Sequence, residues 1–231
     1  MSKITKNKLE NIRKKVRTYG IKNQHKKGIK FLQSLFNNEE GYSKNERLQL
    51  DMAFILYHES IKHLFKKKIS KKQEKESEKQ IEKAIKICKR VLYGKSRSKD
   101  TKNIINARMF LAQIYAILNK PHAIYLAKEN FNQEPGIVTA NRLADVYFRL
   151  GKIKLAETWY KKYENLALKE GCPTYQVFAN MAVFYKEIQK EKHAQEYFRR
   201  AFDSLPKTPE AKSVILILKK YFNFRIENGS R

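Results

Sequence analysis

Residues 174–206, TYQVFANMAVFYKEIQKEKHAQEYFRRAFDSLP, carry the pattern that decides the fold. Ala182 is small enough to let a second helix approach closely, and Tyr185 follows one turn later to fill the space beside it. Further along, small and aromatic residues fall at i, i+4 and i+7 on one helix face, and a proline then ends the helix: Ala194, Phe198, Ala201 and Pro206. The segment therefore predicts two antiparallel helices packed as a hairpin.

A similar spacing occurs twice more upstream, with a period of roughly 34 residues, although the first copy lacks one residue in its turn. The residues that repeat it are Leu143, Ala144, Tyr147, Gly151, Ala156 and Tyr160, and before them Leu111, Ala112, Tyr115, Ala123, Ala127 and Pro135. In this respect the chain resembles tetratricopeptide repeat (TPR) proteins. The resemblance implies an all-α fold, a right-handed superhelical solenoid of TPR-like helix-turn-helix repeats with a C-terminal capping helix.

Composition and breaks in periodicity divide the chain into four parts. We expect a basic N-terminal helical pair at 1–42, a divergent TPR-like hairpin at 43–93 with a Lys/Glu-rich insertion at 66–80, three repeats within 94–208, and a capping helix and tail at 209–231. The three repeats cover about 105–135, 137–170 and 175–208. Ser43 and Glu46 have capping-box spacing for the helix that follows, and the polar stretch 94–100 is the expected internal boundary.

In TPR proteins the first helix of each hairpin lines a concave groove that receives extended peptides. By helical position, the resemblance implies that the groove presents eight residues: Met109, Gln113, Asn141, Arg142, Asp145, Arg149, Asn180 and Lys186. The subgroup that clamps chaperone C-termini uses lysine, asparagine and arginine at fixed groove positions, and this pattern is not matched. For Asn141 and Asp145, an ordinary hydrophilic helix surface remains the alternative.

The chain carries 50 Lys and Arg against 23 Asp and Glu, a formal net charge of +27. Such a field attracts anionic partners, although lysine-rich coding could also produce it. The candidate nucleic-acid contacts are the basic clusters: Arg13, Lys14, Lys15, Arg17, Lys26, Lys27, Lys30, Lys66, Lys67, Lys68, Lys71, Lys72, Lys95, Arg97 and Lys99. Few aromatic residues lie among them, so little sequence specificity is expected.

The sequence contains no constellation typical of catalysis. The five histidines and two cysteines have no metal-ligand spacing, and no nucleophile can be paired with a base. We therefore predict no catalytic residue, no metal, no cofactor and no small-molecule substrate. Cys88 and Cys172 are too few for a disulfide framework, which favours a reducing cytoplasmic location, and no apolar run is long enough to span a bilayer.

Two functions follow from these patterns. The first is a non-enzymatic scaffold that binds nucleic acid or a nucleoprotein through its basic surface and a protein through its groove. The alternative is an adaptor that recognises an acidic peptide or acidic protein without any nucleic acid. Attachment to a membrane surface through the first basic helix is a weaker third possibility, and the oligomeric state is left open.

Overall fold

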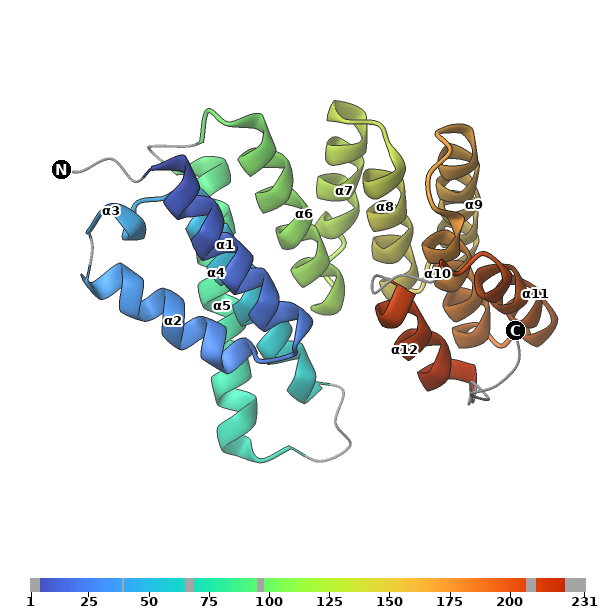
Figure 1. Cartoon of the computed structure of the whole chain (residues 1–231), viewed down its shortest axis with the longest axis horizontal. Helices are drawn as coiled ribbons and strands as arrows, with labels where there is room; N and C mark the ends of the chain where they lie inside the picture. Colours follow the sequence, from blue (N-terminus) through green and yellow to red (C-terminus); the bar gives the residue numbers. More distant parts are fainter. Residues whose placement is uncertain (1–4, 39, 65–68, 95–97, 207–210, 223–231) are drawn as a thin grey trace. The chain divides into compact units, whose positions relative to one another are not determined.

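The computed structural model describes residues 5–38, 40–64, 69–94, 98–206 and 211–222, and this part of the chain contains α-helices and no strand (Figure 1). The helices are α1 (Lys6–Ile21), α2 (His25–Asn38), α3 (Glu40–Ser43), α4 (Glu46–Leu64), α5 (Lys71–Tyr93), α6 (Thr101–Ile117), α7 (His122–Gln133), α8 (Ile137–Arg149), α9 (Ile153–Lys169), α10 (Thr174–Glu187), α11 (Glu191–Asp203) and α12 (Ala211–Phe222). The predicted all-α class of TPR-like hairpins is confirmed.

The chain divides by its contacts into two units, residues 1–130 and 131–231. The division falls within α7, whereas the sequence placed the main break at 94–100. In that region the backbone N–H of Ser98 donates to the Val91 carbonyl, and Arg47 pairs with Asp100 at 3.2 Å. These contacts attach the segment before α6 to α4 and α5, so it does not separate two bodies.

Within the first unit, α1 packs on α2, α4 packs along α5, and α6 contacts both α4 and α5. Small residues stand where helices meet, since Ala53, Ala84 and Ala107 have no exposed surface. The hairpin from α6 to α7 is also held by polar contacts. Arg108 pairs with Glu129 at 3.1 Å, and the Asn130 amide donates to the Ile105 carbonyl at 3.0 Å.

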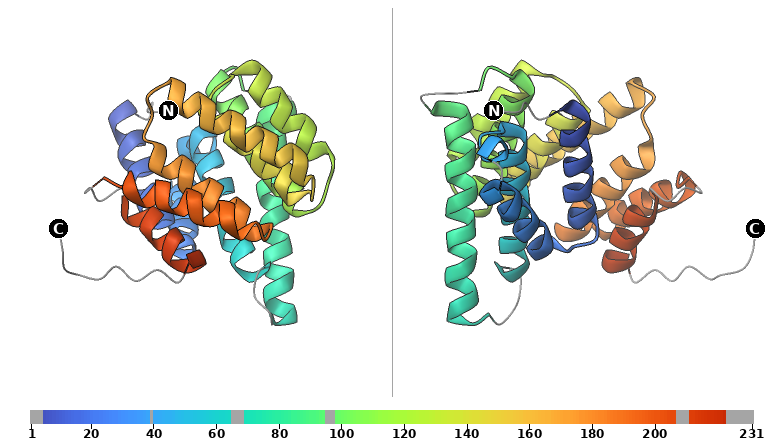
Figure 2. Two further views of the ribbon diagram at one scale, coloured as in Figure 1. Left: turned by 90° about the vertical axis from the view of Figure 1, so that its right-hand side faces the viewer. Right: turned by 60° about the vertical axis from the view of Figure 1, so that its left-hand side comes forward.

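The second unit is built from the hairpins α8–α9 and α10–α11, with α9 also packed on α10 (Figure 2). The alanines that the sequence assigned to helix contacts are fully buried: Ala144, Ala156, Ala182, Ala194 and Ala201. Their small side chains allow the helices to approach closely, and aromatic rings fill the remaining space. Phe184, for example, lies 4.7 Å from the Tyr160 ring and 5.4 Å from that of Phe148, measured between centroids.

Four hairpins share one turn geometry, including the pair α1–α2. The turn residue has a left-handed backbone, with φ of 57° at Asn23, 53° at Asn119, 70° at Gly151 and 59° at Gln189. The next backbone N–H donates to the carbonyl of a tyrosine five residues earlier, as from Gln24 to Tyr19. This bond satisfies a carbonyl at the end of the first helix. Residues 6–38 thus form a TPR-like hairpin that the sequence identified only as a basic helical pair.

Two helix starts differ from the sequence prediction. The start of α4 is capped by Asn45, whose side-chain oxygen accepts from the Leu48 N–H at 3.2 Å, and Ser43 belongs to α3 instead. The helix α5 begins at Lys71, with Ser70 and Gln73 forming a capping box. Residues 71–80 of the predicted insertion are therefore the first turns of α5, while Lys66, Lys67 and Lys68 lie outside the described residues.

The apolar helix α12 packs within the second unit against α10. Ala211, Val214 and Leu218 are buried, and the ring of Phe222 lies 4.8 Å from that of Phe198. The prediction of a capping helix that packs on the last repeat is consistent with these contacts.

Candidate protein-binding site

A polar cluster centred on Asp145 of α8 joins the two helices of the hairpin α8–α9. The hydroxyl of Tyr160 on α9 donates to one carboxylate oxygen at 2.6 Å, and Arg142 donates to the other at 3.4 Å. Burial, together with the neighbouring Asp145 carboxylate, raises the pKa of Tyr160 well above its usual value. Asp145 is thereby fixed in position and its charge is balanced within the protein.

Further polar side chains lie on α8 and α10. Asn180 on α10 is half-buried, and its amide donates to the Tyr163 hydroxyl at 3.4 Å. The side-chain oxygen of Asn141 and the Nε of Arg142 are buried without a hydrogen-bond partner. Buried polar groups normally find partners, so these two atoms of α8 have hydrogen-bonding capacity that their own hairpin does not satisfy.

Carboxylates on α8 and α9 accept hydrogen bonds from tyrosine hydroxyls on later helices. In addition to Asp145, Glu157 accepts from Tyr185 at 3.0 Å, and Glu164 accepts from Tyr197 at 2.7 Å. Lys190 and Arg200 add charge-assisted hydrogen bonds to the same two glutamates. These bonds tie successive helices together and set the position of α10 relative to α9. Sequence reasoning treated Tyr160 and Tyr185 as packing residues, selected Asp145 only as a groove residue, and missed Glu157 and Glu164.

The first unit has its own cleft on α1, α4 and α6, of about 330 Å³. Arg13 donates to Asp51 at 2.9 Å across its wall, and Arg47 and Lys102 add positive charge. The lining on α6 is Lys102, Asn103, Asn106 and Phe110. Met109 and Gln113, the groove residues predicted on the same helix, are half-buried and do not line the cleft. Asn106 precedes Gln113 by seven residues, so helical periodicity could have found it.

The other predicted groove residues lie on the second unit, and they differ in whether their side chains are already bound within the protein. Asn141, Arg142 and Asp145 share one face of α8, and Arg149 is exposed at the end of that helix. Lys186 is committed to a structural role, because its ammonium contacts the Glu191 carboxylate at 2.7 Å and lies over the Phe222 ring. The structure thus brings together Arg142, Asp145 and Asn180. Lys186 is instead paired with Glu191.

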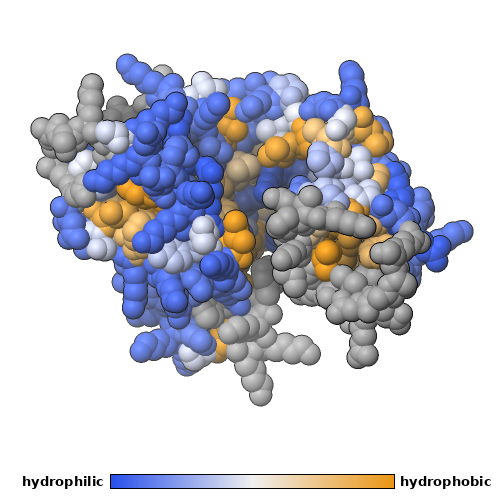
Figure 3. Space-filling model, in the orientation of Figure 1, coloured by the Kyte–Doolittle hydropathy of each residue, from blue (hydrophilic) through white to orange (hydrophobic). Residues whose placement is uncertain are grey.

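The predicted nucleic-acid contacts that the structure describes are spread over several helices. Those exposed are on α1, α2 and α5 and before α6: Lys14, Lys15, Arg17, Lys26, Lys27, Lys30, Lys71, Lys72 and Lys99. Arg13 is engaged with Glu10 and Asp51, and the ammonium of Lys15 lies 4.4 Å from the centroid of the Phe31 ring. Lys95 and Arg97 fall outside the described residues. Hydrophilic side chains cover much of α1 (Figure 3).

The part of the chain that the structure describes contains no group of three His, Cys, Asp or Glu side chains that could hold a metal ion. Among the helices in the described ranges, none combines the length and apolar character needed to cross a membrane.

Comparison with known proteins identifies a repeat in the first hairpin of the second unit. The tetratricopeptide repeat model matches residues 139–169, which comprise most of α8 and all of α9. No curated protein matches the sequence. A solved structure named "MamA AMB-1 P212121" is 14% identical, with a TM-score of 0.40 over 91% of this chain and 99% of that one. The matched segment is therefore similar to a tetratricopeptide repeat, and the hairpins α1–α2, α6–α7 and α10–α11 share the turn geometry of the hairpin that it forms.

Proposed function

We propose that the chain is a non-catalytic adaptor that binds a protein segment across the inner helices α8 and α10. The observation that carries this proposal is the Asp145 cluster, where a buried tyrosine and an arginine fix a carboxylate beside unsatisfied polar groups of Asn141 and Arg142. Such preorganised polar groups lower the entropic cost of binding. Tetratricopeptide repeats act as protein-interaction scaffolds, which agrees with this assignment.

The charge of the site favours an acidic partner. Because Arg142 offsets the charge of Asp145, the net positive charge comes from the exposed Arg149, while 41% of the Arg142 side chain still faces solvent. Asn180 adds an amide that can bind a peptide backbone. A segment with Asp or Glu near an exposed backbone carbonyl would satisfy all three side chains.

Charge reversal at Arg142 or Arg149 is expected to abolish capture of this partner. Cross-linking and quantitative mass spectrometry of purified complexes would compare Arg142→Glu and Arg149→Glu with wild type. The matched control is Lys154→Glu, a charge reversal at an exposed position of α9. We expect at least one protein to be lost about tenfold from both arginine variants and retained by the control. Identical partner lists for all four proteins would contradict the proposal.

Nucleic acid binding is a second proposed function, favoured by the exposed lysines of α1 and α2 and the net charge of +27. Phosphate contacts depend on ionic strength because each one releases counterions. We therefore expect a labelled 20-nucleotide RNA to bind at about 50 mM salt and to lose at least tenfold in affinity by about 200 mM. Lys14→Glu combined with Lys27→Glu should weaken binding further. Absence of binding at the lower salt concentration would rule this function out.

A further inference from the structure

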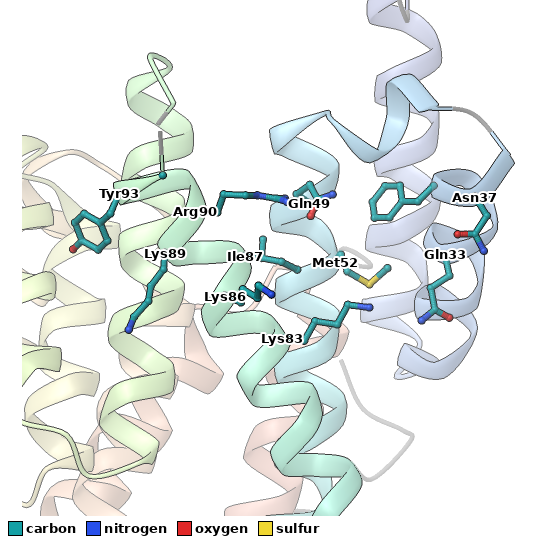
Figure 4. Close-up of a pocket in the computed structure, with 12 residues that line it drawn as sticks. Gln33, Asn37, Gln49, Met52, Lys83, Lys86, Ile87, Lys89, Arg90 and Tyr93 are labelled. Atoms are coloured by element: carbon teal, nitrogen blue, oxygen red, sulfur yellow. The ribbon is translucent and has the colours of Figure 1, made fainter. Parts of the chain in front are cut away.

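A larger groove lies elsewhere in the first unit, between α2 and α5 with α4 as its floor (Figure 4). Its volume is about 790 Å³, and every residue that lines it belongs to residues 33–94. The inner cleft of this unit is formed by α1, α4 and α6, so the groove is a separate surface. In the proposed function it has no role.

The three sides of the groove present residues at helical spacing. The helix α2 contributes Gln33, Phe36 and Asn37, α4 contributes Gln49 and Met52, and α5 contributes Lys83, Lys86, Ile87 and Arg90. These are i, i+3, i+4 and i+7 sets, which form the ridges that another helix packs against. The α5 side from residue 83 to 94 is roughly 18 Å long, about three helical turns.

The apolar part of the groove lies deep and the charged part lies at its edge. Met52 and Ile87 are buried, while Phe36 is half-buried. In Figure 4, Arg90 extends toward Gln49 and Lys83 toward Met52, and Lys89 and Tyr93 also belong to the lining of the groove. An apolar floor with a polar rim is typical of a protein interface, and methionine adapts readily to the side chains of a docked helix.

The charge of the groove has one sign. No Asp or Glu lines it, and Lys83, Lys86, Lys89 and Arg90 form no ion pair with any carboxylate of the described residues. Farther along α5 the adjoining hollow contains Glu59 and Glu76 beside Lys26, Lys30 and Lys72. Glu59 there contacts Lys62 at 3.0 Å. The positive charge that lines the groove itself therefore comes from α5, between Lys83 and Arg90.

We propose that this groove binds an acidic amphipathic helix of a partner protein. The apolar face of that helix packs on Phe36, Met52 and Ile87, and its carboxylates, spaced by three or four residues, face Lys83, Lys86 and Arg90. This is the helix-in-groove mode of recognition. Single-stranded nucleic acid fits less well, because the floor contains methionine and isoleucine instead of the aromatic rings on which bases stack.

The test uses the full chain and a designed probe. The probe is an 18-residue fluorescein-labelled peptide with leucine at i, i+3, i+4 and i+7 and glutamate on both flanks of that stripe. Its matched control has glutamine at every glutamate position. Fluorescence anisotropy at about 150 mM salt measures affinity. We expect the acidic peptide to bind at least tenfold more tightly than the glutamine peptide, with NMR shift changes on α2, α4 and α5.

Charge reversal separates this groove from the general field of the protein. The double variant Lys83→Glu and Arg90→Glu should lower the affinity for the acidic peptide about 30-fold or more, because two attractive charge pairs become repulsive. Lys75→Glu with Lys79→Glu makes the same charge change at exposed positions of α5 that line neither hollow, and we expect a change of less than threefold. Phe36→Ala should also weaken binding, about fivefold, while circular dichroism shows the helices intact.

Three results would overturn the proposal. They are equal loss from both charge-reversal pairs, shift changes located away from α2 and α5, or a 20-nucleotide uridine RNA that binds the groove in preference to the peptide. The Arg142→Glu variant serves to keep the two sites distinct. It should bind the acidic peptide as wild type does while it loses the adaptor partner, so failure of one site can be told from failure of the other.

Discussion

Replacing Phe184 with alanine is expected to destabilise the second unit by about 3–5 kcal/mol. The ring is 1% exposed and touches three other aromatic rings, those of Phe148 on α8, Tyr160 on α9 and Tyr185 on α10. Its removal leaves a cavity at the point where two hairpins meet. Because domains are stable by only about 5–15 kcal/mol in total, a loss of this size unfolds a large share of molecules under mild denaturant.

Urea titration followed by circular dichroism, with hydrogen exchange to locate the change, would measure the effect. The matched control is Phe202→Ala in α11, where the side chain is 41% exposed and a loss below about 1.5 kcal/mol is expected. In a stack of repeats each hairpin depends mainly on its neighbours, so exchange should accelerate in α8–α11. If the two variants were equally stable, Phe184 would not be the centre of the core.

The hairpins were predictable because their signal is local. Ala144, Ala182 and Ala194 each stand at a fixed distance from a tyrosine, and all three are fully buried. Tyr19 and Gly28 have the same separation as Tyr185 and Ala194, and Gly28 is buried against α4, where a side chain would meet Ile55 at 2.8 Å. The N-terminal hairpin was not recognised as a repeat because lysines dominate the other positions of its helices.

The polar contacts could not be predicted because their partners lie far apart in sequence. Tyr185 reaches back 28 residues to Glu157, and Tyr197 reaches back 33 to Glu164. Helical periodicity states which face a residue occupies and says nothing about which carboxylate it will meet there. The groove beside α5 could not be predicted for the same reason. Its walls come from α2 and α5, about 50 residues apart, and their separation depends on how both pack on α4.

The structure also corrects how the basic residues were grouped. Sequence reasoning joined them into clusters by proximity along the chain, which placed Arg13 with Lys14 and Lys15. In the fold Arg13 faces Asp51 on α4, whereas its two neighbours in sequence are exposed. Lys83 and Arg90 were not selected at all, because single bases at helical spacing do not form a run of charge. Their alignment on one face of α5 becomes visible only against the walls of the groove.

Buried tyrosines should make the second unit sensitive to alkali. Burial and the hydrogen bond to Glu164 raise the pKa of Tyr197 to about 12, and burial raises that of Tyr163 to about 12 as well. The pKa values of Tyr160 and Tyr185 are also raised, by burial and by Asp145 and Glu157 respectively. In the unfolded chain a tyrosine loses its proton near pH 10.

The number of protons bound in each state determines whether stability rises or falls with pH. Between about pH 10 and pH 12 the unfolded chain has released these protons while the folded chain retains them. The folded state therefore binds more protons, and its stability falls as the pH rises through this range. Below about pH 10 the contribution of the tyrosines is fully present. Deprotonation of lysines over the same range acts in the opposite direction, because it reduces the repulsion within a chain of net charge +27.

A comparison of wild type with Tyr197→Phe removes the contribution of the lysines, since both proteins carry the same number. At about pH 8 the variant should be less stable by about 1–2 kcal/mol, because the Glu164 carboxylate loses a hydrogen-bond donor while Arg200 still contacts it. As the pH approaches 12 the difference should shrink, because only wild type must keep a phenol protonated against solvent. Urea titrations at each pH, with tyrosinate absorbance near 295 nm, would measure both quantities. A difference in stability that stays constant from pH 8 to 12 would show that Tyr197 ionises without opposition from Glu164, and the carboxylate would then not hold α11 against α9 through this hydroxyl.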